Sequence, residues 1–149
     1  MLFRSSAASV LWITGLPGMG KSTLIETWVQ RTIDSDRNAI GAYFSFSGEQ
    51  NKGMQDALGS MIVKLIERFH LVEELDIICQ KLDEWPSKQY ISSDKIRELF
   101  MITVKGAMKQ QSSGSIVLGV DALDECKKES ISELTRVFSD LIEIGRAHV

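Results

Sequence analysis

The chain has 149 residues, which is enough for one domain with a sizeable core and too few for two. Its formal net charge is −3, with 17 basic residues interspersed among 20 acidic ones, so no basic block marks a nucleic-acid interface. No apolar run is long enough to span a membrane, the first residues show no secretory h-region, and Cys79 and Cys126 lack metal-ligand spacing. We therefore expect a cytoplasmic protein with reduced thiols that binds neither nucleic acid nor membranes.

Strands and helices are predicted to alternate along the chain. The expected order is a strand at Val10–Thr14, a helix from Ser22 to about Ile33, a strand at Ala39–Ser47, helices near 58–69, 71–82 and 96–108, a strand at Ile116–Val120 and a helix from about Ser130. This alternation predicts an α/β fold with a mostly parallel sheet.

Side-chain patterns add detail to these elements. The first helix is expected to turn Leu24, Ile25, Trp28 and Val29 inward. In the second strand, Ala42, Phe44 and Phe46 should face one way and Tyr43, Ser45 and Ser47 the other. In the last helix, Ser130 and Glu133 have the spacing of a capping box.

The segment "GLPGMGKST", residues 15–23, has the pattern G-x-x-x-x-G-K-[ST] between a predicted strand and a predicted helix. Its backbone N–H groups and the helix N-terminus favour an anion, Lys21 supplies a charge for the β- and γ-phosphates, and the Ser22 hydroxyl can ligate Mg²⁺. A structural strand-to-helix turn is the alternative, but it would not need a lysine and a hydroxyl in that order. The candidate nucleotide-binding residues are Gly15, Gly18, Met19, Gly20, Lys21, Ser22 and Thr23.

A second segment, "SIVLGVDALDEC", places an aspartate directly after an apolar strand. A carboxylate at the carboxyl edge of a parallel sheet can reach a metal ion beside a phosphate loop, so Asp121 is the predicted Mg²⁺ partner. Asp124 or Glu125, with Glu125 favoured, could orient the water that attacks the γ-phosphate. The alternative for both is a solvated acidic turn.

Together, "LWITGLPGMGKSTL", "AYFSFS" and "VDALDEC" resemble the NACHT-type NTPases of the STAND class, especially fungal NOD-like receptors and the nephrocystin-type N-terminal NTPase domain. The resemblance covers about Val10–Ile142 and includes the small Ala122 after the aspartate. It implies a three-layer P-loop NTPase sandwich, ATP or GTP binding with Mg²⁺, slow hydrolysis, and a switch whose nucleotide exchange permits self-association and signalling. Gly119 departs from the bulky residue usual there, which predicts weaker packing of that strand.

The last six residues, "IGRAHV" (144–149), match the translation of a common sequencing adapter, and we expect them to be an artefactual tail. Residues 1–9 would then be a lead-in and residues 10–143 a partial NTPase domain. In NTPases of the kind that the chain resembles, a sensor strand lies between the first strand and the aspartate strand. Its absence would leave unpaired strand edges, so we expect weak stability and little activity from this chain alone.

Two other functions remain open. A small-molecule kinase shares the phosphate loop, but the candidate lid at Asp83–Ser93 carries no arginine. The chain could also be a non-catalytic interaction fragment that binds partner subunits through the helices between Met54 and Lys109.

Overall fold

The computed structural model describes residues 13, 15–48, 52–86, 90–111 and 115–147. These residues form five α-helices, two β-strands and one 3-10 turn, in the predicted alternation. The elements are α1 (Lys21–Ser35), β1 (Ile40–Ser45), α2 (Met54–Phe69), α3 (Val72–Glu84), α4 (Ser93–Gln110), β2 (Ile116–Asp121), the 3-10 turn η1 (Leu123–Glu125) and α5 (Lys128–Ala147).

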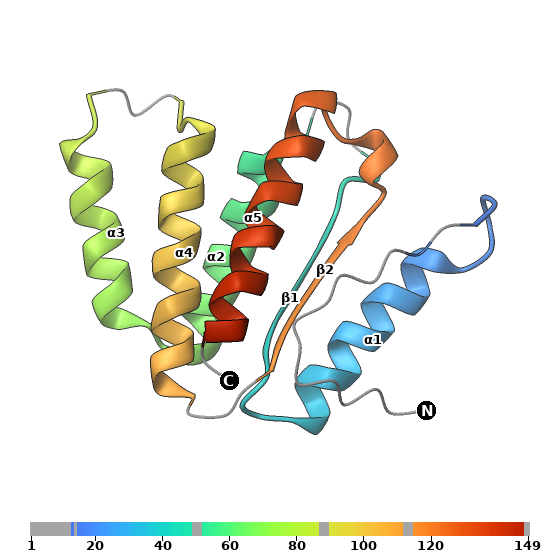
Figure 1. Cartoon of the computed structure of the whole chain (residues 1–149), viewed down its shortest axis with the longest axis horizontal. Coiled ribbons are helices and arrows are strands. Elements are labelled where there is room, and N and C mark those ends of the chain that lie inside the picture. The colour runs from blue at the N-terminus through green and yellow to red at the C-terminus, as the bar shows by residue number, and fades with distance from the viewer. Residues whose placement is uncertain (1–12, 14, 49–51, 87–89, 112–114, 148–149) are drawn as a thin grey trace.

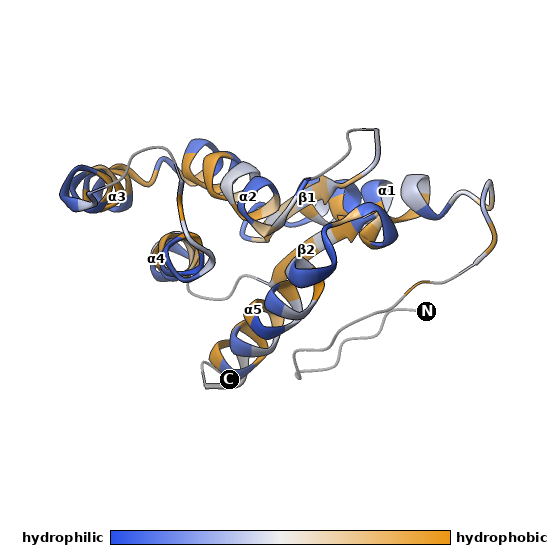
Figure 2. Cartoon of the chain, turned by 90° about the horizontal axis from the view of Figure 1, so that it is seen from above, coloured by the Kyte–Doolittle hydropathy of each residue, from blue (hydrophilic) through white to orange (hydrophobic). Residues whose placement is uncertain are grey.

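The two strands pair in parallel, and helices cover both faces of the sheet (Figures 1 and 2). Helix α1 packs on one face against both strands, whereas α2 packs on the other face against β1, α4 and α5. Helix α3 lies outermost and packs against α4 and α2. The described residues therefore form an α/β fold with a parallel sheet, as the sequence predicts.

Side chains alternate between the two faces of the sheet. Ile40 and Ala42 of β1 are buried in the main core with α2, and Leu118 and Val120 of β2 pack against the same core. The intervening positions face α1, because an added Cβ at Gly41 would meet Ile33 of that helix. The predicted alternation of β1 is thus confirmed, with its apolar side chains toward the larger group of helices.

The inner face of α1 differs in part from the prediction. Val29 is buried, and Ile25 and Ile33 lie against the glycines of the strands, so the packed stripe runs at i, i+4 and i+8. Leu24 and Trp28 are 57% and 47% exposed, so their placement on the inner face was wrong. Successive helical residues are about 100° apart, and α1 packs mainly against the two strands, a narrow surface that one stripe covers.

Gly119 allows close contact between β2 and α1. A Cβ built on it would lie 2.8 Å from Val29 Cγ2, 3.0 Å from Tyr43 Cδ2 and 3.1 Å from Ile25 Cγ2. The expectation of weaker packing at this glycine was wrong, because the missing side chain is what lets the helix approach the strand.

Ser130 also has a role that the sequence did not predict. Helix α5 begins at Lys128, so Ser130 lies inside it, and the Ser130 hydroxyl accepts a hydrogen bond of 3.0 Å from the backbone N–H of Met54. Ser130 therefore caps the start of α2, a distant element, and the predicted capping box at the start of α5 was wrong. The capping box in this structure is at α2, where the Gly53 N–H donates to the Asp56 carboxylate at 2.7 Å.

The predicted strand at Val10–Thr14 lies outside the described residues except for Ile13, which is not in a strand. Within the described part of the chain, β2 pairs with β1 alone. Helix α5 continues through Ile144 to Ala147, into the predicted tail. No helix of the described residues has the length and apolarity needed to cross a bilayer.

Candidate functional site

The loop at Gly15–Gly20 leads directly into the first turn of α1. Gly18 and Gly20 have φ values of 79° and 75°, a left-handed conformation that glycine adopts without a steric penalty. Gly20 is the N-cap of α1, and among the described residues no side chain caps this end. The first N–H groups of the helix therefore remain free to bind an anion, which the positive end of the helix dipole also favours.

Lys21 is folded back over this loop. Its Nζ donates hydrogen bonds to the carbonyl oxygens of Gly15 at 2.7 Å and Leu16 at 2.8 Å. An ammonium group has three donors, so one remains for a ligand. The loop itself is exposed, and Leu16 and Met19 are 73% and 71% exposed. The side chains of Ser22 and Thr23 are exposed as well.

Asp121 ends β2 and lies next to two hydroxyl groups of β1. Its carboxylate Oδ2 accepts hydrogen bonds from Tyr43 Oη and Ser45 Oγ, each at 3.3 Å. The parallel register explains this contact, because Ser45 is directly opposite Asp121 and Tyr43 is two residues earlier on the same face. Asp121 is 8% exposed, so the two hydroxyls compensate in part for the desolvation of a carboxylate.

The loop and Asp121 lie at the same end of the sheet. Ile33, late in α1, lies against Gly41 near the start of β1, whereas Ile25, early in α1, lies against Gly119 near the end of β2. Helix α1 therefore runs antiparallel to the strands, and Figure 1 shows its first turn toward the end at which β2 finishes. The topology thus brings residues 15–23 and Asp121 to the carboxyl edge, where open α/β sheets bind ligands.

The pKa of Tyr43 is raised above its ordinary value, mainly by burial and then by the negative charge of Asp121. The hydrogen bond to Asp121 and the charge of Glu26 raise the pKa further, whereas the hydrogen bond with Ser45 lowers it. The phenol therefore stays protonated at neutral pH and can donate to the carboxylate. This contact orients the Asp121 carboxylate.

Beyond Asp121 the chain turns sharply. Ala122 has a φ of 55°, a left-handed conformation in which large side chains are strained, so a small residue fits there. The next turn, η1, places Asp124 and Glu125 at the same end of the sheet with exposed side chains. No residue in the described ranges pairs with either carboxylate, so both are open to solvent.

The oxygen donors at this edge are compatible with Mg²⁺. The described residues hold no cluster of three or more histidine, cysteine or acidic side chains that could bind a metal. Mg²⁺ is usually held by one or two carboxylates together with substrate phosphates and water. Asp121 supplies one such carboxylate, and the Ser22 hydroxyl is an oxygen donor of the type that holds Mg²⁺ beside a phosphate loop.

Asp121 is a residue that the sequence pattern singles out, whereas the two hydroxyls that contact it were not predicted. The signal was present, because alternation puts Tyr43 and Ser45 on one face of their strand. In a parallel sheet, that face continues into the neighbouring strand, which ends at Asp121.

Comparison with known proteins gives one result for the family. The family model described as "Nephrocystin 3, N-terminal" matches residues 2–149, nearly the whole chain. No curated protein and no solved structure matches. The chain therefore belongs to the nephrocystin 3 N-terminal family.

Proposed function

We propose that this chain binds ATP or GTP together with Mg²⁺, as the nucleotide-binding core of a NACHT-type switch of the STAND class. The phosphates would lie on the loop from Gly15 to Gly20 and the first turn of α1, with Lys21 as the cationic ligand. Ser22 and Asp121 would hold the metal. The NTPases that the sequence resembles suggest slow hydrolysis, self-association in the intact protein and a cytoplasmic location.

One observation supports this proposal most strongly. A glycine loop without a side-chain cap, a lysine folded over it and an aspartate with two hydroxyl partners all lie at one edge of a parallel sheet. A structural turn would not require this combination. Metal-phosphate binding uses the loop, the lysine and the aspartate, and hydroxyl partners can orient such a carboxylate.

Asp124 and Glu125 extend the proposal to hydrolysis. Both carboxylates are exposed one turn beyond Asp121, where a group that positions water for attack on the γ-phosphate is needed. Glu125 is our first choice, and phosphate release by Glu125→Gln and Asp124→Asn variants would separate the two.

Nucleotide affinity of a lysine variant tests the proposal directly. Isothermal titration of the 149-residue chain with ATP and with GTP, each with Mg²⁺, should show binding that Lys21→Ala weakens about 10- to 100-fold, as expected for the loss of charge-assisted hydrogen bonds. Lys105→Ala is the matched control, because Lys105 is exposed on α4 and has no partner among the described residues. Equal affinity of Lys21→Ala and the control would refute the phosphate-loop assignment.

A further inference from the structure

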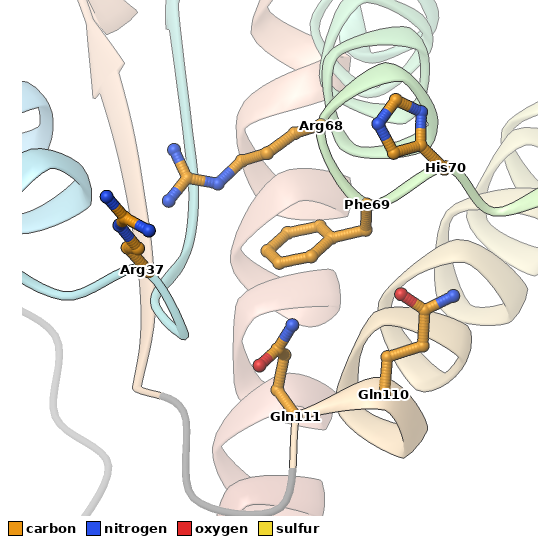
Figure 3. Close-up of a pocket in the computed structure, with 6 residues that line it drawn as sticks. All are labelled: Arg37, Arg68, Phe69, His70, Gln110 and Gln111. Carbon is orange, nitrogen blue, oxygen red and sulfur yellow. The ribbon is translucent and has the colours of Figure 1, made fainter.

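A pocket of about 400 Å³ lies at the opposite end of the sheet from residues 15–23. Arg37, in the turn between α1 and β1, forms one side of it, and the ends of α2 and α4 form the other. Figure 3 shows the residues that line it: Arg37, Arg68, Phe69, His70, Gln110 and Gln111. Its volume is within the range of about 300–1,000 Å³ that is usual for small-molecule sites.

The pocket has two full positive charges and no acidic residue in its lining. Arg37 is exposed and makes no ion pair or hydrogen bond with any described residue. Arg68 donates to the carbonyl oxygen of Ile33 at 3.3 Å, and its guanidinium carbon lies 5.4 Å from the centre of the Phe69 ring. Neither contact neutralises its charge.

The side chains are arranged around a common space. In Figure 3 the guanidinium groups of Arg37 and Arg68 are turned toward the same part of the pocket, and the amide of Gln111 extends toward it from below. Guanidinium groups present several N–H donors in a planar fork, and a glutamine amide adds two more. This combination suits an anion with several acceptor oxygens.

The negative ends of the α2 and α4 dipoles explain only part of the positive charge that Arg37 and Arg68 bring to the pocket. His70 is the C-cap of α2, with a φ of 50° and its N–H bonded to the Ile66 carbonyl, and a cation near this end complements the helix dipole. Each helix terminus carries about half a negative charge, however, against a full charge on each guanidinium. Among the described residues, Ile33 provides the one carbonyl that accepts a hydrogen bond from either arginine of the pocket.

We propose that this pocket is a second ligand site, which binds a phosphate group through Arg37, Arg68 and Gln111. Two guanidinium groups can share the oxygens of one phosphate, and such charge-assisted bonds are among the stronger ones in proteins. The pocket is larger than a phosphate ion, so a small phosphate monoester also fits, with its organic part beside Phe69. The site is separate from the loop at Gly15–Gly20 and does not depend on nucleotide binding there.

Phosphate titration monitored by NMR tests the site if the phosphate loop is disabled. In a Lys21→Ala background, inorganic phosphate and phenyl phosphate are added at constant ionic strength while the side-chain amide signals of Gln110 and Gln111 are followed. We expect the Gln111 signals to shift and saturate with either probe. Tighter binding of phenyl phosphate would identify a monoester as the favoured source of the phosphate group.

Arg37→Gln should weaken this binding about tenfold, the effect of losing one charge-assisted hydrogen bond. Because Arg37 is exposed and makes no ion pair or hydrogen bond with any described residue, the variant should remain folded. Arg136→Gln is the matched control, since Arg136 is exposed on α5 and is not part of the pocket. The proposal fails if the Gln111 signals do not shift in the Lys21→Ala background, or if Arg136→Gln weakens binding as much as Arg37→Gln.

Discussion

At Asp121, one carboxylate meets two hydroxyl groups from the neighbouring strand. The contacts with Tyr43 and Ser45 are both 3.3 Å long, and all three side chains are on the face of the sheet that α1 covers. In metal sites, groups that orient a ligand often matter nearly as much as the ligand itself. The two hydroxyls are therefore the residues that we add to the predicted metal site.

Tyr43 makes the stability of the fold dependent on pH. Its folded-state pKa is raised, so the folded chain keeps the phenolic proton at a pH at which the unfolded chain releases it. The contribution of Tyr43 to folding stability is therefore fully present below its unfolded pKa of about 10, and it is lost as pH rises beyond that value. Urea unfolding at pH 8 and pH 10.5 should show a larger loss of stability in the wild type than in Tyr43→Phe.

Tyr90→Phe is the control for this experiment, since the Tyr90 side chain is largely exposed and accepts a hydrogen bond from Gln55. Lys81 and Cys126 also have raised pKa values, from the hydrogen bond to Glu98 and from burial respectively, but both remain in every variant and cancel in the comparison. If Tyr43→Phe lost as much stability at high pH as Tyr90→Phe, the Tyr43–Asp121 contact would not control this effect.

At the level of the elements, Gly41 and Gly119 determine how closely α1 approaches the sheet. Gly119→Ala would place a methyl group against Val29 and Ile25, and we expect it to destabilise the fold by about 1–3 kcal/mol, the usual cost of overpacking. Gly59→Ala is the matched control, because no atom lies within 4 Å of its added Cβ and alanine favours α2 by about 0.5–1 kcal/mol. Chemical denaturation of both variants should give changes of opposite sign, and a neutral Gly119→Ala would show that the helix can move away.

The start of α2 depends on a residue that follows it by 76 positions. Ser130→Ala removes the acceptor for the Met54 N–H, which should cost about 1 kcal/mol and speed hydrogen exchange in the first turn of α2. Ser132→Ala is the control, since the Ser132 hydroxyl is exposed and bonds only to the Glu129 carbonyl in its own helix. Equal losses in the two variants would contradict a capping role for Ser130.

Local patterns predicted most of the elements because their signals are strong. The apolar stripe of α2 at Leu58, Met61 and Leu65 is fully buried, and the strand before Asp121 and the loop before α1 are as predicted. Contacts between distant segments were not predictable in the same way. Ser130 has a local capping pattern, yet its hydroxyl reaches α2, and only the tertiary fold brings the two together.

The periodicity of apolar residues also could not predict that Leu24 and Trp28 are exposed. Their spacing fits an inner face, but which stripe of α1 is buried depends on the width of the sheet beneath it. Asp121 and residues 15–23 could be singled out from the sequence because metal-phosphate chemistry requires specific residue types, and their role in binding stays a prediction. The hydroxyl partners of Asp121 could be identified only once the register of the two strands was known.

At the scale of the whole molecule, the proposed metal-phosphate site lies at one end of the sheet and the basic pocket at the other. Helices cover both faces of two parallel strands, and such packing is what a small sheet needs for stability. In the described part of the chain, β2 has β1 as its one partner, so our expectation of weak stability remains a prediction. Nucleotide at a hundred times its dissociation constant should raise the free energy of unfolding by about 2.7 kcal/mol.

The effect of Mg²⁺ on nucleotide affinity tests most directly whether residues 15–23 and Asp121 form one site. Titrations of ATP and GTP with and without Mg²⁺ should show that the ion tightens binding to the wild type by about tenfold or more. In Asp121→Asn this gain should largely disappear, while it should persist in the control Asp76→Asn, whose side chain is exposed on α3. An unchanged gain in Asp121→Asn, or no binding of either nucleotide to the wild type, would contradict the account.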